Sequence, residues 1–266
     1  MTGTDPAERA GRSVLVSGNW KMNENHFEGL RLVQELAAML RVTGIPEGRE
    51  VSIHPPFTSL RTVQTAVETD RVPVALGAQT CHHEQRGAFT GEVSAEMLAK
   101  LNVAYVLAGH SERRTFCGET DAVVRAKVDA ILSQGMRPIV CVGETLDQRR
   151  GGEAEERVRR QVVDALSGRS SETIGGLVVA YEPIWAIGTG ETASVDDAQQ
   201  MCAVIRDEIA KLAGPGAAAA VRIQYGGSVT PESAGPLLAA DDVDGLLVGG
   251  ASLDAERFVA IVRAPA

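Results

Sequence analysis

The chain has 266 residues, enough for one large domain or two small ones, and its 44% apolar and 23% charged residues are typical of a globular protein. Its formal net charge of −9 argues against nucleic acid as a partner, because a phosphate backbone attracts clustered Lys and Arg. No apolar run approaches the ~20 residues that a membrane helix needs, so no membrane partner is expected. An anionic substrate would have to be attracted by local positive charge rather than by the surface as a whole.

The N-terminal segment and the cysteines both indicate a reducing compartment. The first residues, MTGTDPAERAGR, contain no apolar stretch like that of a secretory signal, and we expect residues 1–12 to form a flexible tail. No C-x-x-C pair occurs, so free and mostly buried thiols are expected, rather than disulfides or a zinc site, at Cys81, Cys117, Cys141 and Cys202. These features predict a cytoplasmic location.

Short, almost continuously apolar runs recur along the chain, which is the pattern of buried parallel strands. The eight runs cover residues 13–18, 50–54, 73–78, 105–109, 137–143, 176–181, 221–227 and 244–250. Helical patterns separate them, and the clearest cover residues 26–41, 122–135, 194–214 and 230–239. Ser194 with Asp197 three residues later predicts a capping box, and Pro231 after Thr230 predicts a helix start.

This alternation, without a linker or a low-complexity tract, predicts one α/β domain over residues 13–266. A doubly wound open sheet is the competing architecture. An eightfold repeat in about 250 residues favours the closed (β/α)8 barrel. In such a barrel the residues that follow the strands share one rim, and chemistry gathers there.

Polar residues and glycines follow several of the predicted strands. They are Asn19 and Lys21 after the first run, His110 after the fourth, Glu182 after the sixth, Gly226, Gly227 and Ser228 after the seventh, and Gly249 and Gly250 after the eighth. Glycine allows backbone N–H groups to approach a ligand closely, and the last two loops of this fold commonly bind phosphate. A turn without a ligand is the alternative for each glycine pair.

Three side chains at this rim are candidates for chemistry. Glu182 closes a buried strand, where poor solvation would raise its pKa and basicity; the alternative is an ion pair with a buried Arg or Lys. Lys21 suits a phosphate or a developing oxyanion, although an ordinary solvated lysine is the alternative. His110 directly precedes a predicted helix start, which disfavours positive charge and so predicts a neutral ring; a structural histidine is the alternative.

The segment GTGETA at 188–193 matches a dinucleotide-binding fingerprint but lacks its context. Such a fingerprint follows a strand directly and is followed by an acidic residue at the end of a second strand about 20 residues on. Here Pro183 and the segment IWAI intervene, and Asp207 and Glu208 lie within a predicted helix. No dinucleotide cofactor is therefore expected.

The segments GNWKMN, GAFTGE, AGHSERR, CVGE, YEPIWAIGTG, QYGGSV and DGLLVGGAS occur in this order and together resemble the triose-phosphate isomerase family from about Ser13 to Arg263. The resemblance implies a single (β/α)8 TIM barrel, a homodimer, and neither cofactor nor metal. It also implies the interconversion of dihydroxyacetone phosphate and D-glyceraldehyde 3-phosphate in glycolysis and gluconeogenesis.

The resemblance also implies roles for individual residues. Glu182 becomes the base that moves a proton between two carbons, and His110 the electrophile that polarises the carbonyl. Lys21 and Asn19 bind the substrate and stabilise the enediolate, and Ser111 and Glu112 support the His110–Lys21 side of the site. Backbone N–H groups that bind the phosphate are implied at Gly188, Ser228, Gly249 and Gly250.

The remaining motifs are assigned to a lid and to an intersubunit loop. The resemblance implies that residues 184–187 form the apolar body of a lid, with Pro183 before it and glycines after it, and that Thr90 of GAFTGE lies on the loop that reaches into the partner subunit. Glu191 departs from the family, in which Lys more often follows GTG. Two other functions stay open: a barrel aldolase, for which the eight runs supply no Schiff-base lysine, and a non-catalytic phosphate-binding scaffold.

Overall fold

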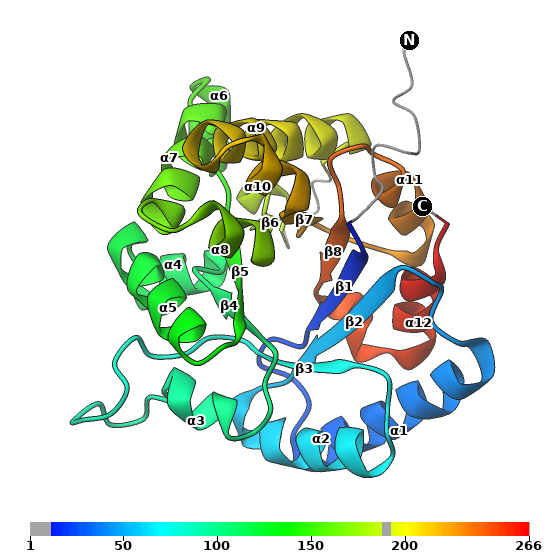
Figure 1. Cartoon of the computed structure of the whole chain (residues 1–266). Coiled ribbons are helices and arrows are strands. Elements are labelled where there is room, and N and C mark those ends of the chain that lie inside the picture. The colour runs from blue at the N-terminus through cyan, green and yellow to red at the C-terminus, as the bar shows by residue number, and fades with distance from the viewer. Residues whose placement is uncertain (1–11, 188–192, 266) are drawn as a thin grey trace.

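The computed structural model of the chain describes residues 12–187 and 193–265, which form a closed barrel of eight parallel strands surrounded by helices (Figure 1). Each strand pairs with the next along the chain, and β8 pairs with β1 to close the barrel. The strands are β1 (Val14–Asn19), β2 (Arg49–His54), β3 (Ala75–Ala78), β4 (Tyr105–Ala108), β5 (Arg137–Val142), β6 (Val178–Tyr181), β7 (Arg222–Tyr225) and β8 (Gly245–Val248). The predicted closed barrel is confirmed, and the open sheet is excluded.

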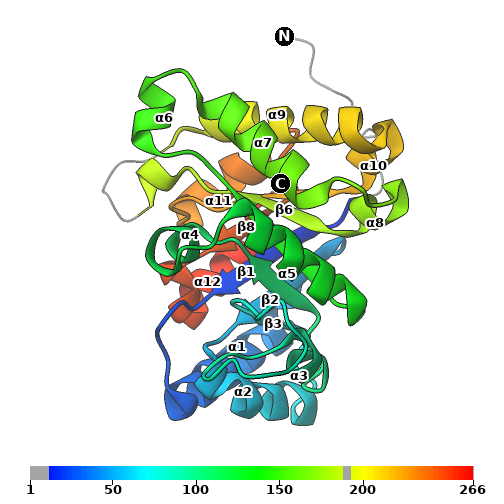
Figure 2. The same cartoon turned by 90° about the vertical axis from the view of Figure 1, so that its left-hand side faces the viewer.

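Helices of very different length cover the outside of the barrel (Figure 2). In the described ranges these are α1 (His26–Thr43), α2 (Phe57–Thr69), α3 (Ala95–Ala99), α4 (Ser111–Cys117), α5 (Asp121–Ser133), α6 (Leu146–Arg150), α7 (Ala154–Leu166), α8 (Ser171–Gly176), α9 (Val195–Ala213), α10 (Pro215–Ala220), α11 (Pro231–Leu238) and α12 (Ala255–Arg263), with 3-10 turns η2 (Ile184–Ala186) and η3 (Gly250–Leu253). The predicted capping box of Ser194 and Asp197 begins α9. Pro231 occupies the first turn of α11 after the N-cap Thr230, also as predicted.

The barrel interior contains a short chain of polar side chains among apolar ones. Ser52 Oγ donates to Ser17 Oγ over 2.9 Å and lies 3.0 Å from Nε2 of His54. His54 Nδ1 lies 3.1 Å from the carbonyl oxygen of Ala78, and burial lowers the pKa of this histidine to about 4. Gly77 gives the imidazole its space, since a Cβ there would lie 2.3 Å from the ring.

Residues 1–11 of the predicted tail lie outside the described residues. Arg12, the last residue of that predicted tail, pairs with Asp244 over 2.7 Å at the entrance to β8. The four cysteines are unpaired; Cys117 is exposed and the other three are buried. None of the described helices has the length and apolar character needed to cross a membrane.

Candidate active site

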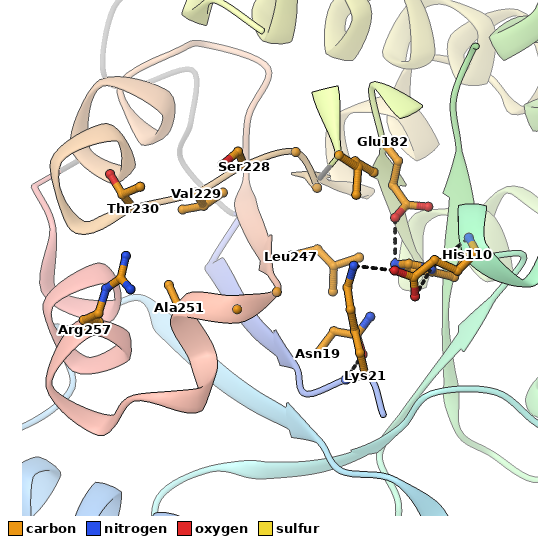
Figure 3. A pocket seen from close by; sticks show the side chains of 16 residues that line it. Asn19, Lys21, His110, Glu182, Ser228, Val229, Thr230, Leu247, Ala251 and Arg257 are labelled. Atoms are coloured by element: carbon orange, nitrogen blue, oxygen red, sulfur yellow. Dashed lines mark hydrogen bonds and ion pairs between the residues drawn. The ribbon is translucent and has the colours of Figure 1, made fainter. Parts of the chain in front are cut away.

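The loops that follow β1, β4, β6, β7 and β8 enclose a pocket of about 420 Å³ (Figure 3). The parallel barrel brings these strand ends to one rim, so residues far apart in sequence meet there. The lining residues are Asn19, Lys21, His110, Glu112, Glu182, Ile187, Gly226, Gly227, Ser228, Val229, Thr230, Leu247, Gly249, Gly250, Ala251 and Arg257. The pocket therefore unites the strand-end residues that the sequence singled out.

Lys21 enters the pocket from an unusual backbone conformation. Its φ is +54°, a left-handed value that costs energy for a residue with a side chain. Its N–H donates to Asn19 Oδ1 over 3.0 Å, and its carbonyl oxygen accepts a 2.7 Å hydrogen bond from Gln79. Its ammonium pairs with Glu112 over 2.6 Å. Sequence analysis missed Gln79, because a hydrogen bond to a backbone carbonyl leaves no pattern in the sequence.

His110 caps the N-terminus of α4 with its own ring. The backbone N–H of Glu112 donates to Nδ1 of His110 over 3.3 Å, which places the imidazole proton of the neutral form on Nε2. That nitrogen lies 2.9 Å from Oε1 of Glu182. Burial alone would lower the pKa of His110, but the carboxylates of Glu182 and Glu112 together raise it above its ordinary value. The prediction of a neutral ring did not include these neighbouring acids.

Glu182 is fully buried and makes several contacts to the segment after β4. Its carboxylate accepts a 2.9 Å hydrogen bond from the N–H of Ser111, lies 3.4 Å from the Ser111 hydroxyl, and pairs with His110. Burial would raise the pKa of Glu182, but His110, the Ser111 N–H and Lys21 lower it below its ordinary value. The predicted increase is therefore wrong for this arrangement. The partner of Glu182 is His110, which forms an ion pair only when its ring is protonated, and not the buried Arg or Lys of the alternative prediction.

Glycines line the end of the pocket opposite His110. A Cβ on Gly227 would lie 2.1 Å from the Tyr225 hydroxyl, and one on Gly249 would lie 3.5 Å from Cε of Lys21. Gly250 begins the short turn η3, and glycines of the loops after both β7 and β8 line the pocket. Ser228 also lines the pocket, whereas Gly188 lies outside the described residues.

The first part of the predicted lid is tied to a buried acid. Glu144, which follows β5, accepts hydrogen bonds from the Tyr181 hydroxyl over 3.0 Å and from the indole N–H of Trp185 over 2.8 Å. Arg149 lies 4.6 Å from the centre of the Trp185 ring. Ile187 lines the pocket. Glu144 was not predicted as a site residue, although it too directly follows an apolar run.

A second groove, of about 310 Å³, lies beside the first and shares Lys21 and His110 with it. Its wall includes the strongly exposed Met22 and Phe116. Thr90 does not line either cavity; it lies in the exposed loop between β3 and α3, which projects from the barrel (Figure 1). Within the described residues, no group of three or more His, Cys, Asp or Glu side chains is arranged to hold a metal.

The sequence and the geometry agree with one family. Residues 14–265 match the family model described as Triosephosphate isomerase. The triosephosphate isomerase of Mycobacterium tuberculosis strain H37Rv is 50% identical over 250 residues, which cover 94% of this chain and 95% of that protein. The triosephosphate isomerase of Mycobacteroides abscessus is 49% identical over 247 residues, which cover 93% of this chain and 94% of that protein. The chain therefore belongs to the triosephosphate isomerase family.

Proposed function

We propose that Glu182, His110 and Lys21 carry out the reaction of this family, the interconversion of dihydroxyacetone phosphate and D-glyceraldehyde 3-phosphate in glycolysis and gluconeogenesis. The observation that carries the proposal is the convergence of a buried carboxylate, an imidazole with an Nε2 proton and an ammonium on one pocket. A base, an electrophile and a cation are the groups that proton transfer next to a carbonyl requires.

The proposed reaction begins when Glu182 takes a proton from the carbon next to the substrate carbonyl. The electron pair of the broken C–H bond forms the C=C bond of an enediolate, and the carbonyl oxygen gains negative charge. The Nε2 proton of His110 and the ammonium of Lys21 stabilise that oxygen. His110 then moves a proton between the two oxygens, and Glu182 returns its proton to the neighbouring carbon. No redox partner or external proton source is needed, because the product is an isomer of the substrate.

The phosphate of the substrate is proposed to bind at the glycine-lined end of the pocket. Backbone N–H groups of Ser228, Gly249 and Gly250 would donate to its oxygens, together with that of Gly188 from outside the described residues. The lining of the pocket by residues of both glycine loops supports this placement. No cofactor or metal is proposed, since the protein groups supply both proton transfer and charge stabilisation.

The neighbours of the three reacting side chains are proposed to position them. Asn19 fixes the backbone of Lys21, and Glu112 pairs with its ammonium. Ser111 and His110 hold the Glu182 carboxylate. To reach a substrate carbon, the Glu182 carboxylate has to break these contacts. The hydrogen bond from the Ser111 N–H therefore holds the base only until substrate binds.

A homodimer in the cytoplasm completes the proposal. The groove beside the active site, with Met22 and Phe116 exposed on its wall, offers an apolar surface to a second copy of the chain. The loop that carries Thr90 projects from the barrel and is the proposed inserted element (Figure 1). A cytoplasmic location follows from the place of the reaction in glycolysis and agrees with four free cysteines.

A coupled isomerase assay on the purified chain tests the function. Wild-type protein should convert D-glyceraldehyde 3-phosphate in the presence of a chelator, and Glu182→Gln should lose nearly all activity while it still binds phosphoglycolate. Full activity of Glu182→Gln would remove the carboxylate from the reaction. Complete inactivity of the folded wild-type dimer would contradict the proposed function as a whole.

A further inference from the structure

Arg257 lies in the first turn of α12 and lines the active-site pocket, although no sequence motif pointed to it. Figure 3 shows it at the end of the pocket away from His110 and Glu182, with its guanidinium directed toward Thr230. Asp254 is the N-cap of α12 and accepts a hydrogen bond from the backbone N–H of Arg257, which fixes the position of this residue on the helix. The side chain itself is exposed to the pocket and to solvent.

The guanidinium of Arg257 has no hydrogen bond or ion pair within the part of the chain that the structure describes. The hydrogen bond from Thr230 lowers the pKa of the exposed Glu232 carboxylate on α11, and the positive charge of Arg257 lowers it further. Lys21, the other cation of the pocket lining, is by contrast already paired with Glu112. Arg257 is therefore the cation of the pocket lining whose charge is not already balanced by an ion pair among the described residues.

The charges of the lining explain why this cation matters. The lining holds the acids Glu112 and Glu182 and the permanent cations Lys21 and Arg257, so its formal charge is 2 − 2 = 0 with His110 neutral. Without Arg257 the lining would carry a net −1 in a chain whose formal net charge is already −9. A phosphate dianion would then approach a repulsive pocket.

We propose that Arg257 is a specificity residue for the phosphate group: it attracts the dianion to the pocket and holds it there electrostatically, in addition to the backbone N–H groups of the glycine loops. The inference rests on the proposed function. Because the guanidinium is exposed and lies at the far end of the pocket from the reacting groups, it acts on substrate binding and not on proton transfer. The positive charge of Arg257 thus offsets the overall negative charge of the chain at the pocket.

The expected effect is modest and depends on salt. If the guanidinium and the phosphate dianion are about 8 Å apart in water-like surroundings, their attraction strengthens binding of the dianion roughly fivefold. At 0.5 M salt, screening reduces this gain in affinity to well under twofold. Arg257→Gln should therefore raise KM and the dissociation constant of phosphoglycolate about fivefold at low ionic strength, with kcat unchanged. Arg257→Lys should restore most of the affinity, and Arg257→Glu should weaken it by roughly a further fivefold.

The matched control is Arg31→Gln, which changes the net charge of the chain by the same amount at an exposed site on α1 away from the pocket. Kinetics and phosphoglycolate titration at 20 mM and 500 mM salt compare the two variants with wild type. A fivefold loss confined to Arg257→Gln and to low salt supports the proposal. Equal effects in both variants, a salt-independent loss, or a fall in kcat alone would overturn it. Activity of the wild type in the same assay keeps the proposed function separate from this outcome.

Discussion

His54 makes the stability of the barrel depend on pH in a predictable way. The ring is fully buried, and its pKa falls from the ordinary value of 6.5 to about 4 because burial disfavours the charged form. Above pH 6.5 the ring is neutral in both folded and unfolded chains, so its titration contributes nothing to the pH dependence. Between pH 6.5 and pH 4 only the unfolded chain binds the proton, and stability is lost as the pH falls.

The size of the loss follows from the two pKa values. A difference of about 2.5 units corresponds to about 3.4 kcal/mol when complete, of which about 2 kcal/mol is already lost at pH 5. Urea unfolding at pH 7.5 and pH 5.0, at a fixed protein concentration, measures the loss. Other groups titrate in this range, so the comparison is with His54→Gln, which keeps a polar group but does not titrate.

His54→Gln will change the free energy of unfolding by the same amount at every pH. Between pH 7.5 and pH 5.0, however, the free energy of unfolding of the variant should fall by about 2 kcal/mol less than that of the wild type. The difference between the two pH dependences is therefore the decisive quantity. Equal losses in the two proteins would refute the reasoning, since they would show that His54 takes up its proton in the folded barrel at an ordinary pKa.

Three further predictions concern the active site and the assembly. Glu182→Asp withdraws the carboxylate by about one methylene, so kcat should fall about 100-fold with little change in KM, and a fall of less than threefold would remove Glu182 from the role of base. Lys21→Met should cost about 3 kcal/mol of transition-state stabilisation, with greatly weakened inhibition by phosphoglycolate; unchanged inhibition would place the lysine elsewhere. Thr90→Arg should give weakly active monomers of 28.1 kDa by light scattering, because an unpaired charge would be buried in the contact, and a fully active monomeric wild type would contradict the dimer.

The barrel and the meeting of the strand-end residues in one pocket were predictable because both depend on local patterns. Buried parallel strands are apolar along their whole length, so the eight strands could be recognised from composition alone. Residues that directly follow such strands meet at one rim whatever their separation in sequence. That rule predicts that Lys21, His110 and Glu182 share one rim, and all three line the same pocket.

The residues that were missed act through contacts that do not repeat in sequence. Gln79 donates to the carbonyl oxygen of Lys21, and Arg257 extends into the pocket from the helix after β8. Glu144 follows its strand as directly as Glu182 does, but its partners Tyr181 and Trp185 come from the next strand and loop. Only the three-dimensional arrangement distinguishes an acid that holds the segment after β6 from one that lines the pocket.

The pKa of Glu182 is lowered, whereas the sequence predicted an increase, and the physical cause bears on catalysis. The sequence-based prediction for Glu182 rested on burial, which raises the pKa of a carboxylate, and that for His110 rested on the helix start after it, which favours a neutral ring. In the structure the two groups lie 2.9 Å apart, and their attraction reverses both shifts. In the proposed reaction Glu182 turns from His110 and Ser111 toward a substrate carbon, which would weaken this attraction while burial remains. The carboxylate would then become a stronger base and the ring would return toward its neutral form, so the proposed movement would also prepare both groups for proton transfer.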